Sequence, residues 1–184
     1  MHGYRSFDTR NSLKYTASGD IVYTTAALGV VMDTQSKQQE YFMNHSDDVV
    51  ALALHPNGVV VATGQMAHAT GRRHASVDIY VWESASPSSP LAHFTGIHKR
   101  AIRVLAFSPS GRKLLAVGDD DYHTMTVHEW AQGILNCSVK LDRARVLSAL
   151  FTSEDEVVTS GVKHVKFWSL KGQNPKCHRA LFGK

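Results

Sequence analysis

The stretch His45–Gly64, HSDDVVALALHPNGVVVATG, decides the fold because the chain repeats it at His98–Gly118, HKRAIRVLAFSPSGRKLLAVG. The copies align at an offset of 53 residues, and each passes from an apolar run through a Pro-x-Gly turn into a second apolar run. A fainter copy, VLSALFTSEDEVVTSG, occupies Val146–Gly161. A short β-rich run after each copy closes on a tryptophan, namely Trp82, Trp130 and Trp168. Strand–turn–strand units that recur at a period of about 40–50 residues are typical of β-propeller blades.

The repeat predicts an all-β chain of about four blades, each with four strands. The expected blades are residues 1–44, 45–97, 98–140 and 142–184. Between the second and third strands of the second blade, Gln65–Ala75 shows no period and is expected to be a surface loop. The outermost strand of the last blade is expected at Ala180–Phe182 or beyond the chain.

The expected ring is incomplete. A closed propeller takes about 4–8 blades, and the end blades read as apolar rather than as polar caps. We therefore expect an open arc without strand pairing between residues 1–44 and 142–184. Such a fragment, expressed alone, is expected to aggregate or oligomerise because its end sheets stay uncovered.

Composition indicates a folded protein of the reducing cytoplasm. The 184 residues are 43% hydrophobic, and the longest apolar run, Ala26–Met32, is too short to cross a bilayer. Cys137 and Cys177 make no disulfide or metal framework. The formal net charge of +4 arises in the second half, where residues 141–184 carry eight Lys or Arg and four Asp or Glu. This excess weakly favours an acidic partner.

Three motifs resemble the echinoderm microtubule-associated protein-like family, and they occur in the order found there. The opening is similar to that family's HELP motif, and later stretches resemble its WD repeats. The matching segments are GYR at Gly3–Arg5, RNSLKY at Arg10–Tyr15, GDIVYTTAALGVV at Gly19–Val31, DDVVALALHPNGVVVATGQ at Asp47–Gln65, GVKHVKFW at Gly161–Trp168, Arg179, and FGK at Phe182–Lys184.

The resemblance implies the N-terminal part of a tandem atypical β-propeller, in proteins that associate with microtubules. It favours a non-catalytic scaffold that binds tubulin or microtubules in the cytoplasm, without a cofactor. A general WD-repeat adaptor with no cytoskeletal role is the alternative. No membrane partner is expected, and nucleic acid is a poorer partner because the aromatic residues are committed to strands.

In WD repeats, a buried set of histidine, hydroxyl, aspartate and tryptophan commonly holds each blade, and such a network fixes geometry only if every member is bonded. In this chain the set is degenerate. The second blade offers His45, Thr63 and Trp82, with Ser76 at the aspartate site. The third offers His98 and Trp130, with Val117 where the hydroxyl is expected. The fourth offers Ser160 and Trp168 without the histidine.

The remaining polar residues carry no catalytic or metal signature. No Gly-x-Ser-x-Gly or phosphate-binding glycine loop occurs, which argues against an enzyme. The histidines lack zinc spacing, and the run Asp119–Asp121 lacks the further ligands of a calcium loop. Exposed cations could bind tubulin, the acidic partner that the resemblance implies, or could simply be solvated surface residues. The candidates are Lys99, Arg100, Arg103, Lys163 and Lys166.

Overall fold

The computed structural model describes residues 3–5, 7–67, 77–172 and 174–180 and consists of four antiparallel four-stranded sheets. The first sheet holds β1 (Leu13–Tyr15), β2 (Ile21–Thr25), β3 (Leu28–Met32) and β4 (Gln39–Phe42). The second holds β5 (Val49–Leu54), β6 (Val60–Gln65), β7 (Ile79–Glu83) and β8 (Ser86–Phe94). The third holds β9 (Ile102–Phe107), β10 (Lys113–Gly118), β11 (Thr124–Glu129) and β12 (Ile134–Lys140). The fourth holds β13 (Val146–Ser153), β14 (Glu156–Gly161), β15 (His164–Ser169) and β16 (Lys176–Arg179).

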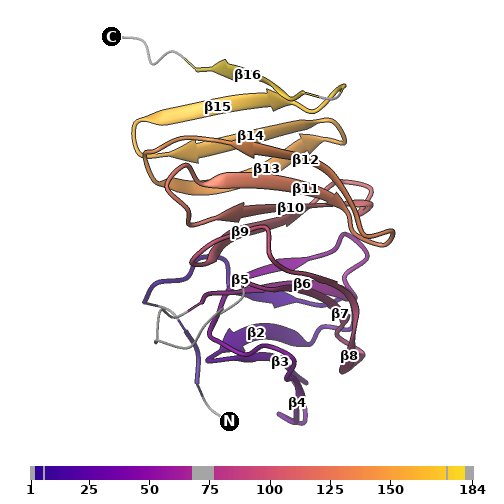
Figure 1. Ribbon diagram of the computed structural model, residues 1–184. Helices are drawn as coiled ribbons and strands as arrows, with labels where there is room; N and C mark the ends of the chain where they lie inside the picture. The colour runs from indigo at the N-terminus through magenta and orange to yellow at the C-terminus, as the bar shows by residue number, and fades with distance from the viewer. Residues whose placement is uncertain (1–2, 6, 68–76, 173, 181–184) are drawn as a thin grey trace.

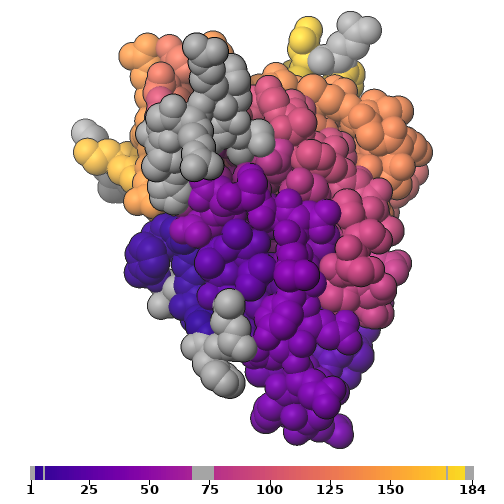
Figure 2. All heavy atoms as spheres, turned by 60° about the horizontal axis from the view of Figure 1, so that its bottom comes forward, coloured from indigo at the N-terminus to yellow at the C-terminus, as the bar shows by residue number. Residues whose placement is uncertain are grey.

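Within each sheet the strands follow one another in chain order, and the sheets stack face to face in the same order (Figure 1). The first and the last sheet lie at opposite ends of the stack, and the space-filling view shows the same order (Figure 2). No helix occurs in the described part of the chain, so none there could span a membrane.

The repeated stretch folds as a hairpin for reasons visible in its residues. All but the last residue of β5 is buried, as expected for a strand covered on both faces. After Pro56, the Asn57 side-chain oxygen accepts hydrogen bonds from the backbone N–H groups of Val59 and Val60. Gly58 then takes a φ of +71°, which a side chain would disfavour.

A separate hydrophobic core fills each gap between neighbouring sheets. Between the first and second sheets, the indole of Trp82 stacks on Phe42 with ring centroids 4.9 Å apart. Gly29 permits this stacking, since a Cβ there would lie 2.7 Å from the Trp82 ring. The second core packs around Ile79, Ile102 and Leu114, and the third around Leu115, Val127 and Trp168.

The inner strands β5, β9 and β13 line a central cavity of about 300 Å³, with Arg10, Asn11 and Lys14 at its edge. No strand of the first sheet pairs with one of the fourth in the described residues. The fold is therefore an all-β propeller segment of four blades in an open arc.

The structure corrects one predicted strand and one predicted loop. The outermost strand of the fourth sheet is β16, at Lys176–Arg179 rather than Ala180–Phe182. Gln65 is the buried end of β6 and not part of a loop, while residues 68–76 of the expected loop lie outside the described residues.

Candidate functional site

The second sheet contains a continuous hydrogen-bonded chain built from Trp82, Thr63, His45 and Gln65. The Trp82 Nε1–H donates to Thr63 Oγ1 at 3.0 Å, and Thr63 Oγ1 lies 2.8 Å from His45 Nε2. His45 Nδ1 lies 2.8 Å from Gln65 Oε1, and the Gln65 amide nitrogen donates to Ser46 Oγ at 3.0 Å. The three residues predicted for this blade, His45, Thr63 and Trp82, are therefore hydrogen-bonded to one another. Gln65, which was not predicted, extends the network.

The partners fix the direction of every proton in this chain. The backbone N–H of Ser46 donates to Gln65 Oε1, so this atom is the amide oxygen and can only accept. His45 must then donate from Nδ1 and accept the Thr63 hydroxyl proton at Nε2. Burial lowers the pKa of His45 to about 4, which keeps this tautomer neutral at pH 7.

In the third sheet a different hydroxyl replaces the missing one. His98 Nε2 lies 2.9 Å from Thr126 Oγ1 on β11, and His128 Nε2 lies 3.1 Å from the same atom. One hydroxyl carries one proton, so at most one histidine can accept from Thr126 and at least one donates to it. Burial lowers the pKa of both imidazoles to about 4. This triad was not predicted. The spacing pointed to position 117 on β10 for the hydroxyl, whereas the hydroxyl comes from Thr126 on the neighbouring strand β11.

The structure places Trp130 outside this network. It follows the end of β11, is only half-buried, and donates its Nε1–H to the carbonyl oxygen of Gly111 at 2.7 Å. Its ring lies edge-on to His55 and Phe107 at 6.1 Å from each. Trp130 thus fastens a turn, and His128 stands at the register position that Trp82 holds in the second sheet.

In the fourth sheet, Trp168 bonds to Thr159 and not to Ser160. The indole N–H donates to Thr159 Oγ1 at 3.0 Å. Trp168 pairs with Val157, and Thr159 lies two residues further along β14 on the same face, whereas Ser160 faces the other way. The signal that could have found Thr159 is this alternation of Val157 and Thr159, both of which are buried.

Lys166, predicted as a surface cation, is an internal ion-pair partner. Its Nζ lies 2.8 Å from Asp142 Oδ2 and donates to the Leu141 carbonyl at 2.6 Å, and its side chain is 14% exposed. The hydrogen bond from Lys166 lowers the pKa of Asp142 to about 2. This pair occupies the region of the fourth sheet where the missing histidine would stand.

The other predicted cations lie in different surroundings. Arg100 is exposed but forms an ion pair with Asp121, and Arg103, beside the central cavity, pairs with Asp119 at 2.6 Å. Lys99 and Lys163 are exposed. The predicted group Lys99, Arg100 and Arg103 is therefore largely neutralised by the neighbouring aspartates.

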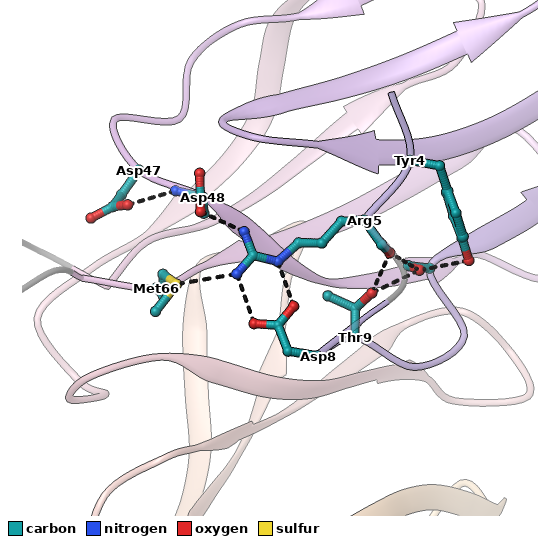
Figure 3. A network of polar contacts seen from close by, with 8 residues as sticks. Tyr4, Arg5, Asp8, Thr9, Asp47, Asp48 and Met66 are labelled. Carbon is teal, nitrogen blue, oxygen red and sulfur yellow. Dashed lines mark hydrogen bonds and ion pairs between the residues drawn. The ribbon is translucent and has the colours of Figure 1, made fainter. Parts of the chain in front are cut away.

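A further polar cluster ties the N-terminal segment to the second sheet (Figure 3). The Arg5 guanidinium binds both carboxylate oxygens of Asp8 at 2.7 Å and also forms an ion pair with Asp48, just before β5. The hydrogen bond to Asp8 is the largest effect that raises the pKa of Arg5, and it lowers that of Asp8. Sequence reasoning missed this cluster because Asp48 lies 43 residues from Arg5.

The acidic and histidine side chains of the described residues do not gather into a metal site. These residues contain no group of three or more His, Cys, Asp or Glu side chains arranged to hold a metal ion. Within the Asp119–Asp121 run, Asp120 accepts hydrogen bonds from the backbone of Tyr122 and Thr124. These contacts cap a turn.

Buried tryptophan–threonine pairs in stacked four-stranded meanders define an open segment of a WD-repeat β-propeller. A chain in the crystal structure of the mitotic checkpoint complex shares this fold, with a TM-score of 0.74 and 13% identity over 95% of this chain and 52% of that one. Residues 38–184 match the first β-propeller of echinoderm microtubule-associated proteins, and residues 1–30 match the HELP motif. The chain belongs to the echinoderm microtubule-associated protein-like family.

Curated relatives align along nearly the whole chain. The echinoderm microtubule-associated protein-like 2 of Rattus norvegicus is 34% identical over all of this chain and 29% of its own length. The echinoderm microtubule-associated protein-like 1 of Homo sapiens is 32% identical over all of this chain and 23% of its own length. The 77 kDa echinoderm microtubule-associated protein of Lytechinus variegatus is 31% identical over 94% of this chain and 26% of its length. The chain thus spans 23–29% of these relatives.

Proposed function

We propose that this chain is a non-catalytic scaffold segment that binds tubulin or microtubules and so resides on the cytoplasmic cytoskeleton. The observation that carries the proposal is family membership along the whole chain, since the matched relatives are named microtubule-associated proteins. A rigid stack of sheets with separate cores suits a scaffold, because it holds surface residues in fixed relative positions.

The polar groups of the blades support a non-catalytic role. The imidazoles of His45, His98 and His128 are each bonded to a buried threonine hydroxyl, and their lowered pKa values keep them neutral. His45, with both ring nitrogens bonded, holds blade geometry and is not free to shuttle protons.

The test is co-sedimentation of the 184-residue chain with polymerised tubulin, across a series of tubulin concentrations. We expect a saturable fraction in the pellet that decreases as salt is added, because exposed charges are screened beyond about 8 Å at physiological ionic strength. The matched control is the chain centrifuged without tubulin, which separates binding from self-aggregation. If the chain stays in the supernatant at all tubulin concentrations, it does not bind polymerised tubulin. The alternative function, a general WD-repeat adaptor with no cytoskeletal role, would then replace the proposal.

A further inference from the structure

Five cationic side chains line one edge of the stack where the third and fourth sheets meet. They are Lys140, Arg143, Arg145, Lys163 and Arg179, here called the cationic strip. All five are exposed, and none has a carboxylate within ion-pair distance among the residues that the structure describes. This sets them apart from Arg5, Arg100, Arg103, Lys113 and Lys166, which are all ion-paired.

Direct contacts make the strip continuous. Lys140 and Arg143 both lie over the Tyr122 ring, with the charged groups 4.7 and 5.2 Å from its centroid. The Arg145 carbonyl accepts the backbone N–H of Val162, the residue before Lys163. Arg179 then donates to the Lys163 carbonyl at 3.2 Å. The strip therefore runs from the end of β12, across the β14–β15 turn, to the end of β16.

Neighbouring carboxylates do not cancel this charge. Asp142, next to Arg143 in the chain, is paired with Lys166. Asp119, Asp120 and Asp121 share a hollow of about 410 Å³ with Arg143. Asp119 and Asp121 are paired with Arg103 and Arg100, and Asp120 accepts hydrogen bonds from the backbone of Tyr122 and Thr124 and from the Thr124 hydroxyl. Five like charges without internal partners repel one another, and an anionic partner would relieve that repulsion.

We propose that the cationic strip is a docking surface for an extended acidic peptide segment, an inference that rests on the proposed function for its tubulin source. The chemistry favours peptide carboxylates over nucleic acid. Tyr122, the aromatic ring beside the strip, is half-buried and already carries two cations, so a base has little surface on which to stack. Val162, 47% exposed between the cations, adds an apolar contact suited to a peptide.

The test uses the triple variant Arg143→Glu, Arg145→Glu, Lys163→Glu in the 184-residue chain. Its matched control is Lys37→Glu, Arg112→Glu, Lys171→Glu, which changes the net charge equally at exposed turns on the opposite edge of the sheets. Lys37 and Lys163 also share a left-handed backbone, with φ of +61° and +62°, so the two variants are alike in local strain.

The probes are a poly-glutamate peptide, polymerised tubulin and a single-stranded RNA homopolymer. We expect the strip variant to bind poly-glutamate and polymerised tubulin about tenfold more weakly, equal to about 1.4 kcal/mol, and the control to match wild type. A variant with Gln at the same three positions should bind with an affinity between those of the strip variant and wild type. It replaces the Glu variant in the test if the Glu variant does not fold. Equal affinities of the strip variant and the control for poly-glutamate would overturn the inference.

The probes also separate this inference from the proposed function. If wild type pellets with microtubules and the strip variant pellets equally well, the proposed function stands and the docking surface is elsewhere. If wild type binds poly-glutamate through the strip without pelleting on microtubules, the acidic-peptide surface stands and tubulin is excluded as its source. Binding of RNA more tightly than poly-glutamate would overturn the inference in favour of a nucleic-acid surface.

Discussion

Thr63 is the residue on which the second sheet's hydrogen-bonded chain depends, and replacing it with valine should be costly. Thr63 and Trp82 are both fully buried, and His45 is 6% exposed. Valine has nearly the same shape as threonine but removes both the acceptor for the Trp82 N–H and the donor to His45 Nε2. Two buried polar groups lose their partners, at about 1–3 kcal/mol for each.

The fourth sheet supplies a matched control. Thr159 is also fully buried, but within the described residues the side-chain hydrogen bond that Thr159→Val removes is the single one to the Trp168 indole. Thr63→Val should therefore reduce the free energy of unfolding by about twice as much as Thr159→Val. Urea unfolding followed by tryptophan fluorescence measures both changes, provided that the slope with denaturant is unaltered.

A second variant tests whether the loss arises from the unpaired groups. In Thr63→Val combined with Trp82→Phe, the indole N–H that lost its acceptor is itself absent, so the double variant should lose less than the sum of the single ones. A free energy of unfolding for Thr63→Val within about 0.5 kcal/mol of wild type, the size of a typical surface effect, would refute the reasoning. So would a loss no larger than that of Thr159→Val.

Three further outcomes follow from the structure. The free energy of unfolding should fall as pH drops from about 6.5 toward 4, because in this range histidines are protonated in the unfolded chain but stay neutral when buried in the folded one. Urea midpoints measured between pH 7.5 and 4.5 test this. The histidines concerned are His45, His98 and His128, whose pKa values lie at about 4. Gly29→Ala should cost about 1–3 kcal/mol by forcing a Cβ against the Trp82 ring, and an unchanged thermal midpoint would contradict that packing. Asp142→Asn should destabilise by leaving the Lys166 ammonium without its carboxylate, while adding Lys166→Met should restore part of the loss in the same urea assay.

Much of the strand pattern could be predicted from the repeat. The two apolar runs of the repeated stretch fold as β5 and β6, and the His55–Gly58 turn between them forms as its proline and glycine indicated. His45, Thr63 and Trp82 meet because their blade keeps the regular register from β6 to β7. Alternation of strand side chains turns such a spacing into a reliable statement about which residues share a face.

The other two networks escaped prediction because register cannot be counted from spacing alone. In the third sheet a bulge after Val117 shifts the pairing of β10 with β9, and the hydroxyl comes from Thr126 across the sheet. In the fourth, Ser160 precedes Gly161 as Thr63 precedes Gly64, but the residue two beyond the pairing partner of Trp168 is Thr159. Ion pairs such as Lys166–Asp142 join residues 24 positions apart along the chain and leave no local pattern.

The separate cores between sheets also give the molecule an uneven resistance to opening. The second and third sheets are covered on both faces, whereas the first and fourth are covered on one, with Tyr15 and Phe167 64% and 49% exposed. In a linear stack each unit is stabilised by its nearest neighbours, so an end unit can detach while the middle stays folded. Backbone amides of β6 and β10 should then exchange with solvent water only when the whole stack opens. Amides of β2 and β15 gain a faster route through fraying of the ends.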